Sequence, residues 1–314
     1  QMAFYIGVDG GGTKTEFALY DEKKQLIASV FGPGSNHENY EESFEKAASV
    51  IWEGLNRLVD EAKISLNDVK FTLMGLAGID HSFQYDAMCE ILRKYGLERF
   101  EIFNDGFIVV KAGSISGAAI GYNCGTGTCC NAVDSKGRML QLAGLGDFSG
   151  DVGNGQWIAI NTFKLVYDEV YLGLEKTLLT ELLFKRFDLK NRESFLALLE
   201  KIEREQANEL VMSLISIFFE AVNRFDKRAL ELVEVMAMRG AQLIAAHCSQ
   251  LNFENDPVEV ILSGSIHTKL PSQVYIQRLE EKTEQLAQRE FKFIVLDKAP
   301  VYGCINWIMQ SYND

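Results

Sequence analysis

Positive charge is scarce in this chain of 314 residues. Its 31 Lys and Arg residues stand against 44 Asp and Glu residues, so the formal net charge is −13. Nucleic acids and anionic membranes bind basic surfaces that displace their counterions. We therefore expect neither as a main partner, and an anionic ligand such as a nucleotide must be bound by local groups.

The sequence also lacks long apolar runs. No uninterrupted apolar stretch reaches the length of a membrane-spanning helix, and no segment of the printed sequence resembles a signal peptide. We therefore expect a cytoplasmic protein. Hydrophobic residues make up 47% of the chain, which at this length predicts two domains of ordinary size with sizeable cores.

Metal-binding spacings of Cys and His are absent as well. The six cysteines include no C-x-x-C pair and the four histidines show no zinc-like spacing. We interpret the cysteines as reduced thiols and assign the histidines no catalytic role. Cys129 and Cys130 are adjacent, which two small residues on a buried strand explain. The alternative is that they ligate a cluster shared between subunits.

A glycine-rich turn near the start of the chain is the most informative motif. Residues 5–19 read as an apolar strand, a carboxylate, three glycines and a second strand that begins Thr-Lys-Thr. Three glycines let backbone amides point at one anion, with phosphate the obvious candidate, and Asp9 can hold a hydrated Mg²⁺ beside it. The turn opens a hairpin and not a helix, so it is neither a P-loop nor a dinucleotide fingerprint. Lys14 is equally a phosphate contact or a solvated strand residue.

The periodicity predicts a duplicated α/β organisation. The first half reads as three strands, a helix, a strand, a helix and a strand, at residues 4–8, 14–20, 25–31, 40–62, 71–78, 82–94 and 100–105. The pattern restarts with strands at 117–124 and 129–133 and a third after 137. It continues with strands at 258–263 and 291–297 and a closing helix at 299–309.

A mostly helical insertion lies between these strands, at about 155–250. Its last part, 229–246, is apolar on most faces and is predicted to be buried. The chain is thus predicted to be two βββαβα domains, 2–113 and 114–314, with the insertion in the second. The last helix, about 299–311, is expected to pack back on the first domain.

Several polar residues stand where ligands gather in such a fold. Gly125, Thr126 and Gly127 repeat the glycine turn in the second half, so we expect phosphates to lie between the two turns. Asp105 ends a strand, and it is either a general base or a turn or helix cap. Asp151 is equally a ligand contact or the N-cap of a helix starting near residue 156. Asn36 is either a contact or the cap of the helix that follows it.

In this order, the motifs Asp-Gly-Gly-Gly-Thr-Lys-Thr (9–15), Ser-Asn-His (35–37), Asn-Asp-Gly (104–106), Cys-Gly-Thr-Gly-Thr (124–128) and Gly-Asp-Val-Gly-Asn (150–154) carry a resemblance. The chain resembles, over nearly its whole length, the N-acetylglucosamine kinase and BadF/BadG-type ATPase family within the actin-like ATPase and sugar kinase superfamily. The resemblance implies two ribonuclease H-like, actin-like ATPase domains around a nucleotide cleft.

The resemblance also implies roles for individual residues. The first phosphate motif matches Gly11, Gly12, Thr13 and Lys14, and Asp9 matches the residue that holds hydrated Mg²⁺. The second phosphate motif matches Gly125, Thr126 and Gly127, and the adenosine motif matches Gly264. The sugar contacts match Asn36, Asp105, Gly146 and Asp151, with Asp105 as catalytic base.

Two positions depart from the family pattern. Val152 stands where the family usually has Glu, and Leu145 stands where amino-sugar kinases often have an aromatic residue. These departures concern the identity of the sugar more than the phosphoryl transfer.

The leading hypothesis is therefore an ATP- and Mg²⁺-dependent kinase that phosphorylates a hydroxyl of an amino sugar of the N-acetylglucosamine or glucosamine type. We expect a homodimer. One alternative is an ATPase that activates a dehydratase or reductase through an iron–sulfur cluster, with Cys124, Cys129 and Cys130 as the only cysteines near enough to one another to ligate it. Another is a nucleotide-gated regulator without turnover, favoured if Asp105 points away from the cleft.

Overall fold

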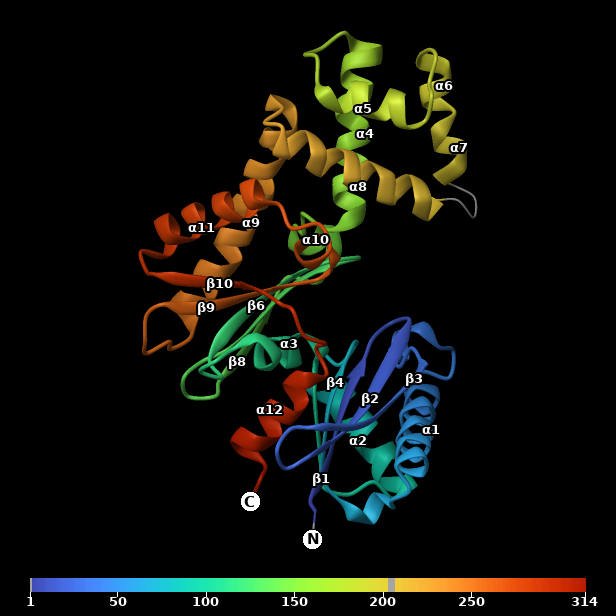
Figure 1. Cartoon of the computed structure of the whole chain (residues 1–314), viewed down its shortest axis with the longest axis vertical. Helices are drawn as coiled ribbons and strands as arrows, with labels where there is room; N and C mark the ends of the chain where they lie inside the picture. Colours follow the sequence, from blue (N-terminus) through green and yellow to red (C-terminus); the bar gives the residue numbers. More distant parts are fainter. Residues whose placement is uncertain (1, 203–206) are drawn as a thin grey trace. The chain divides into compact units, whose positions relative to one another are not determined.

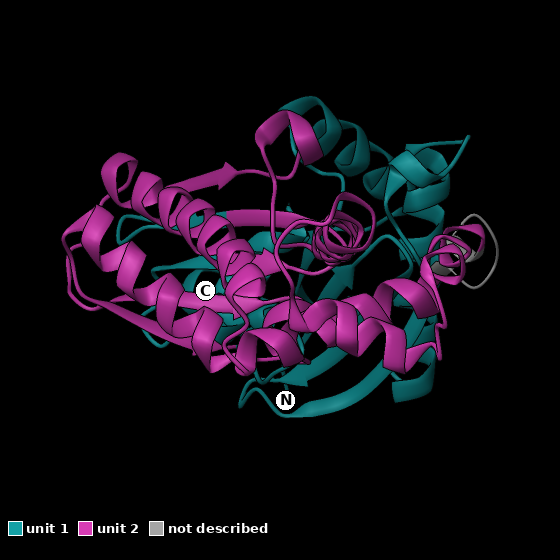
Figure 2. Cartoon of the chain, turned by 90° about the horizontal axis from the view of Figure 1, so that it is seen from above, with its two compact units in different colours: residues 1–121, 131–137, 296–314 teal, residues 122–130, 138–295 magenta. Residues whose placement is uncertain are grey.

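The computed structural model describes residues 2–202 and 207–314 (Figure 1). These residues form two compact units (Figure 2). Unit 1 comprises residues 1–121, 131–137 and 296–314, and unit 2 comprises 122–130 and 138–295. The last segment thus belongs to the unit built mainly from the first part of the chain, whereas the predicted boundary after residue 113 lies before the first change of unit at 121.

Unit 1 is built on a five-stranded sheet with the order β3-β2-β1-β4-β5. Its strands are β1 (Phe4–Gly10), β2 (Lys14–Asp21), β3 (Leu26–Pro33), β4 (Val69–Leu76) and β5 (Phe100–Phe103). Strands β1, β2 and β3 are antiparallel neighbours, and β4 and β5 run parallel to β1. Asp9 is in register with Gly75, which pairs with Phe103. The parallel strands therefore end at one edge of the sheet, where their loops carry the candidate residues.

Four helices pack around this sheet. They are α1 (Phe44–Ala62), α2 (Ser82–Tyr95), α3 (Asp105–Gly113) and α12 (Tyr302–Ser311). Helix α1 covers β2 and β3 with a stripe of buried apolar residues, and α12 packs on α3 and β1. The resulting core includes Ile6, Val8 and Phe17, which are fully buried.

One prediction for unit 1 was wrong, and one helix was not predicted. The helix after Asn36 is only the short 3-10 helix η1 (His37–Asn39), and α1 begins later, at Phe44. Residues 41–43 form a turn, and Ser43 has a positive φ of 52°, outside the range of a right-handed helix. Helix α3, which starts at Asp105, was not predicted. A second short 3-10 helix, η2 (Leu66–Asp68), precedes β4.

The second sheet has the order β10-β9-β6-β7-β8. Its strands are β6 (Ala119–Cys124), β7 (Thr128–Val133), β8 (Met139–Leu142), β9 (Val258–Ser263) and β10 (Phe291–Val295). The division between the units passes through β6 and β7. Shorter elements join these strands: η3 (Gly146–Ser149), α10 (Ser265–Thr268) and α11 (Gln273–Ala287).

Residues 155–202 and 207–250 are mainly helical. They contain α4 (Gly155–Leu172), α5 (Leu178–Arg186), α6 (Arg192–Leu196), α7 (Leu198–Ile202), α8 (Ala207–Asn223) and α9 (Lys227–Gln250). Figure 1 shows α9 beside α11, against which it packs.

Helix α9 is amphipathic, and residues 229–246, which were predicted to be buried, are buried or half-buried except at Glu231, Val235 and Gln242. Its buried residues recur every three or four positions, as in Val233, Met236 and Gly240, whereas Val235 is 48% exposed. One stripe packs inward, and charged residues such as Glu231 occupy the outer face.

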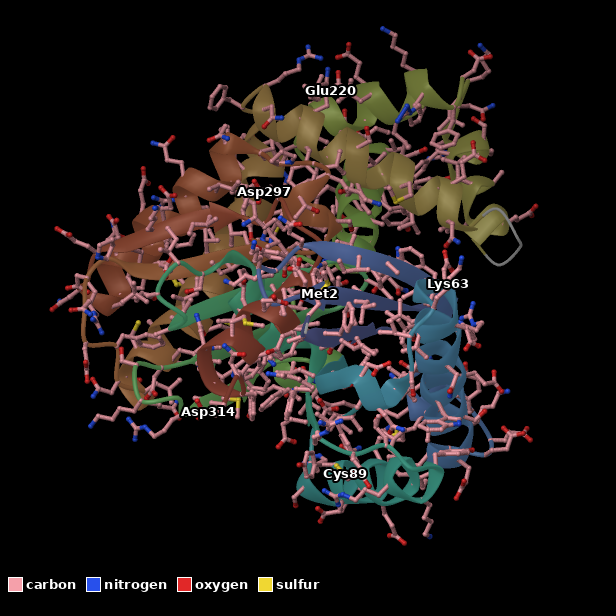
Figure 3. All side chains as sticks on the ribbon, turned by 60° about the horizontal axis from the view of Figure 1, so that its bottom comes forward. Met2, Lys63, Cys89, Glu220, Asp297 and Asp314 are labelled. Atoms are coloured by element: carbon pink, nitrogen blue, oxygen red, sulfur yellow. The ribbon has the colours of Figure 1, made fainter. Side chains whose placement is uncertain are left out.

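Polar side chains, ending in oxygen or nitrogen atoms, are spread over the surface (Figure 3). Within residues 2–202 and 207–314, no helix is long and apolar enough to cross a membrane.

Candidate functional site

The glycine turn of unit 1 is held tightly between two neighbouring loops. The amide of Gly11 donates to the carbonyl of Lys14 over 2.9 Å, and its own carbonyl accepts from Ser35 over 3.0 Å. A Cβ on Gly34 would lie 2.1 Å from the Gly12 carbonyl oxygen, so only glycine allows this approach. The loop before η1 therefore packs directly on the turn.

This packing decides which amides of the turn can face a ligand. The Gly11 amide is already used inside the turn, whereas Gly12 and Thr13 are exposed, and neither amide has an acceptor among the described residues. Exposed, unpaired amides at a glycine turn are suited to bind phosphate oxygens. Lys14 is also exposed, with its Nζ 5.6 Å from the centre of the Phe31 ring, and both interpretations of this residue stay open.

Asp9 is half-buried, and its carboxyl group lies near two other acidic side chains. Its pKa is raised to about 7, first by burial and then by the charges of Asp105 and Glu16, while Lys14 opposes these effects. A cation with a preference for oxygen ligands would relieve this repulsion, so the donor chemistry fits a hydrated Mg²⁺. Among the described residues, no group of three or more His, Cys, Asp and Glu side chains forms a metal cage. A metal bound here would take most of its ligands from water and phosphate.

Asp105 is the first residue of α3, and its neighbour caps the helix. The side-chain oxygen of Asn104 accepts from the Gly106 amide over 3.0 Å, so the cap in the Asn-Asp-Gly motif is Asn104. Asp105 is half-buried, and its pKa is raised to about 6 by burial and then by Asp80, against the opposing effect of the amides of Asp105 and Gly106. A carboxyl group that titrates near neutral pH is a suitable proton acceptor.

The sequence analysis missed three polar residues near Asp105. Asn104 donates from Nδ2 to Asp80 Oδ1 over 3.0 Å, and Asn131 donates from Nδ2 to Asn104 Oδ1 over 3.2 Å. Asp80 follows β4 as Asp105 follows β5, and acidic residues after two adjacent parallel strands were a usable signal. Nothing local marked Asn131, which is buried on β7.

Asn36 lies close to this polar group. Its side-chain oxygen accepts from the Glu38 amide over 3.0 Å, which makes it the cap of η1. Gly78 has a φ of 85°, and a Cβ there would lie 2.4 Å from Asn36 Oδ1. The loop after β4 therefore contacts Asn36 through Gly78 and Asn104 through Asp80. The neighbouring His37 is buried, and burial lowers its pKa.

The second glycine turn lies between β6 and β7 in unit 2. The Gly125 amide donates to the Gly127 carbonyl over 2.9 Å, and the Gly155 amide at the start of α4 donates to the Gly125 carbonyl over 2.8 Å. Gly264 has a φ of 83°, and a Cβ there would lie 2.2 Å from the Cys124 carbonyl oxygen. The structure thus brings Gly264 against the second turn, in which Thr126 and Gly127 are exposed.

Asp151 organises the loop around η3. Its Oδ2 accepts from the amides of Gly144 and Gly146 over 3.0 Å each, and its Oδ1 accepts from Ser149 Oγ over 2.7 Å. The predicted alternative, that Asp151 caps α4, was wrong, because Asn154 accepts from the first turn of that helix.

The cysteines are unsuited to hold an exposed cluster. All six are free, and Cys124 and Cys130 are fully buried while Cys129 is half-buried. Burial raises the pKa of Cys124 to about 12 and raises the pKa of Cys130 as well. Because Cys124 and Cys130 expose no thiol to solvent, this arrangement disfavours a cluster shared between subunits.

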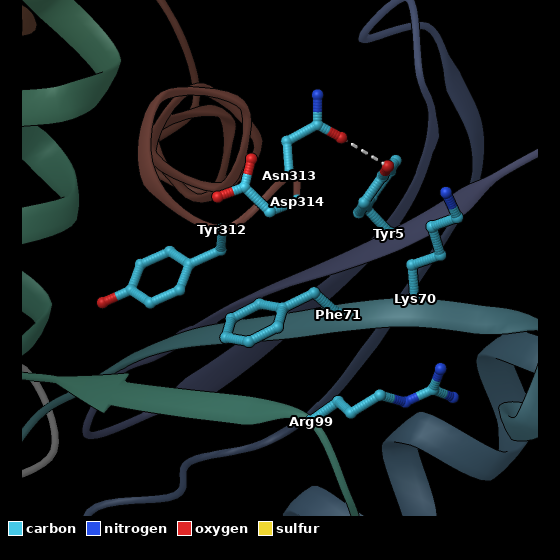
Figure 4. Close-up of a pocket in the computed structure, with 7 residues that line it drawn as sticks. All are labelled: Tyr5, Lys70, Phe71, Arg99, Tyr312, Asn313 and Asp314. Atoms are coloured by element: carbon cyan, nitrogen blue, oxygen red, sulfur yellow. Dashed lines mark hydrogen bonds between the residues drawn. The ribbon is translucent and has the colours of Figure 1, made fainter.

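A pocket of about 260 Å³ lies in unit 1, away from the glycine turn (Figure 4). It is lined near the start of β1 and β4 by Tyr5, Lys70 and Phe71, together with Arg99 and the last residues of the chain. The Tyr5 hydroxyl donates to Asn313 Oδ1 over 2.7 Å. The Phe71 and Tyr312 rings are stacked, with their centres 4.7 Å apart. None of the predicted site residues lines this pocket.

Comparison with curated proteins finds two relatives of known name. The chain is 27% identical over 198 residues to the N-acetylmuramic acid/N-acetylglucosamine kinase of Clostridium acetobutylicum, covering 62% of this chain and 63% of that protein. It is 27% identical over 208 residues to the N-acetyl-D-glucosamine kinase of Dictyostelium discoideum, with the same coverage. The match thus spans slightly less than two thirds of the length of these relatives.

Solved structures share the fold over nearly the whole chain. A candidate N-acetylglucosamine kinase from Chromobacterium violaceum is 20% identical, with a TM-score of 0.65 and coverage of 98% of this chain and 99% of that one. A ROK family glucokinase from Streptomyces griseus, solved with glucose and AMPPNP, is 14% identical, with a TM-score of 0.57 and coverage of 99% and 100%. These likenesses confirm the predicted α/β fold class with two domains.

A protein-family model matches most of the chain in sequence. The model of the BadF/BadG/BcrA/BcrD ATPase family matches residues 6–289, which include both glycine turns and the helical insertion. This agrees with the resemblance found in the sequence motifs. The chain therefore belongs to the BadF/BadG/BcrA/BcrD ATPase family.

Proposed function

We propose that the protein is an ATP-dependent kinase that phosphorylates a hydroxyl of an amino sugar of the N-acetylglucosamine or glucosamine type. The observation that carries this proposal is Asp105, a carboxyl group with a pKa raised to about 6 at the start of α3. It lies in the same unit as the glycine turn and Asp9. The names of the two curated relatives support the substrate class.

The proposed reaction depends mainly on positioning and charge stabilisation. The exposed amides of Gly12 and Thr13 bind phosphate oxygens, and Asp9 would hold a hydrated Mg²⁺. The metal, when bound, neutralises charge on the phosphates. Asp105 accepts the proton of the sugar hydroxyl as that oxygen attacks phosphorus. In unit 2, Gly125, Thr126 and Gly127 contact the phosphates.

Gly264 contacts the adenosine in this proposal. Its positive φ and its contact with the Cys124 carbonyl bring a bare backbone surface beside the second turn. A flat purine ring packs well on such a surface because no side chain intervenes.

The sugar is bound by Asn36, Gly146 and Asp151, together with the base Asp105. A carboxylate can accept about four hydrogen bonds. Asp151 accepts three within its own loop, so it retains capacity for one sugar hydroxyl.

A coupled ADP-release assay over a panel of hexoses and amino sugars tests the proposal. We expect Mg²⁺-dependent, sugar-stimulated ADP release that is greatest with an amino sugar, and product analysis by mass spectrometry should show one added phosphoryl group. Retained ATP binding without sugar-stimulated turnover would refute the kinase. The expected homodimer stays a prediction that sedimentation equilibrium can check, and the cytoplasmic location stays a prediction as well.

A further inference from the structure

The loop from Ala143 to Asp151 is held by hydrogen bonds among its own residues. Asp151 accepts two backbone amides and the Ser149 hydroxyl, and the Leu145 amide donates to Ser149 Oγ over 2.9 Å. The Asp151 amide returns a hydrogen bond to the Gly146 carbonyl over 3.1 Å. The loop is therefore closed by a central carboxylate and not by packing of apolar side chains.

The loop conformation costs free energy, and the large side chains of the loop do not add to the hydrophobic core. Ala143 has a φ of 61°, a left-handed conformation that costs a residue with a Cβ roughly 1 kcal/mol. The large side chains of the loop point outward, since Leu145 is 71% exposed and Phe148 is 99% exposed. Because no core burial offsets the cost, the fixed shape of the loop itself requires an explanation.

One side chain of the helical insertion fastens this loop. Arg239 on α9 donates from Nη2 to the Ser149 carbonyl over 2.6 Å and from Nη1 to Gln242 Oε1 over 3.2 Å. A Cβ on Gly150 would lie 2.8 Å from Arg239 Nη2, so the guanidinium lies directly against the loop backbone. Arg239 forms no ion pair within residues 2–202 and 207–314. Its charge is therefore directed at the loop carbonyl.

We propose that Arg239 is a positioning residue for the acceptor-sugar site, which it serves by fastening the Ala143–Asp151 loop to α9. The inference rests on the proposed function, in which Gly146 and Asp151 contact the sugar. Arg239 acts through these residues and does not touch the sugar. Gln242, one turn further along α9, orients the guanidinium for this contact.

Steady-state kinetics of Arg239→Gln test the proposal. We expect KM for the sugar to rise about tenfold, the effect of losing one hydrogen bond from a charged donor, with KM for ATP within twofold of wild type. Arg239→Lys keeps the charge and should recover part of the loss. Arg228→Gln is the matched control, because Arg228 lies on the same helix and pairs with Glu231 at 2.7 Å, away from the loop. It should leave both KM values unchanged.

Hydrogen exchange of the loop amides tests the same fastening without turnover. The amides of Gly144 and Gly146 should exchange at least several-fold faster in Arg239→Gln than in wild type, whereas Arg228→Gln should match wild type. Unchanged exchange, or equal rises in KM for sugar and ATP, overturns the inference. If the wild-type protein shows no sugar turnover but the exchange difference is present, the proposed function fails while the fastening of the loop by Arg239 stands.

Discussion

Replacing Asp105 with Asn removes the proposed base while keeping the shape of the side chain. A positioned general base contributes roughly 10²–10⁴-fold to a reaction rate, so kcat of Asp105→Asn should fall by that factor. This corresponds to about 2.7–5.4 kcal/mol of lost transition-state stabilisation. Affinity for ATP should stay near normal. The raised pKa of about 6 also predicts that wild-type activity rises with pH through this region, because the base must be deprotonated.

The same substitution should lower turnover but raise stability at neutral pH. The pKa of Asp105 is raised from 3.8 to about 6 in the folded protein, so folding favours the protonated carboxyl. Its stabilising contribution is present below about pH 4 and is lost as the pH rises through 6. At 1.36 kcal/mol per pH unit, the charged carboxyl lowers the free energy of unfolding at pH 7.5 by up to about 3 kcal/mol. Asp105→Asn should therefore be more stable than wild type at pH 7.5 and similar at pH 4.

Kinetics between pH 5 and 8.5 and urea unfolding at pH 4 and 7.5 measure both effects. Asp86→Asn is the matched control, because Asp86 is exposed on α2 and the same charge is removed there. It should change neither turnover nor the pH dependence of unfolding. Wild-type turnover of Asp105→Asn would show that the carboxyl does not accept the proton. Lower stability of this variant at pH 7.5 would show that burial and Asp80 do not disfavour the charged carboxyl.

Three further predictions concern the surroundings of the site. Asp80→Asn should lower the pKa of Asp105 by about one unit, as seen by carboxyl NMR titration, because a like charge is removed; an unmoved pKa would exclude Asp80 as a cause. Gly264→Ala should lower the free energy of unfolding by about 1–3 kcal/mol and raise KM for ATP, because the added Cβ would lie 2.2 Å from the Cys124 carbonyl oxygen. Urea unfolding and steady-state kinetics measure these effects. Unchanged stability and KM would contradict the close packing at Gly264. Asp9→Asn should raise the Mg²⁺ concentration needed for half-maximal activity; an unchanged Mg²⁺ dependence would remove Asp9 from the metal site.

Local sequence predicted most of the elements. Strands β1 and β2, with the glycine turn between them, were recognisable because apolar runs, a carboxylate and three glycines act within a few residues. The helices α4 and α9 were recognisable from their helical periodicity. Helix α3 was missed because it has only nine residues and most of them are apolar, so its pattern resembles a continuation of the strand before it.

The amino-acid sequence by itself determined where the chain turns, which residue types stand at the turns and to which family the chain belongs. Only the tertiary structure decided which of these residues meet. Asn104 contacts Asp80 and Asn131, which lie 24 and 27 residues away, and Arg239 reaches Ser149 from 90 residues away. Such contacts depend on how strands and helices pack, and a local pattern carries no information about a partner that the fold alone brings near.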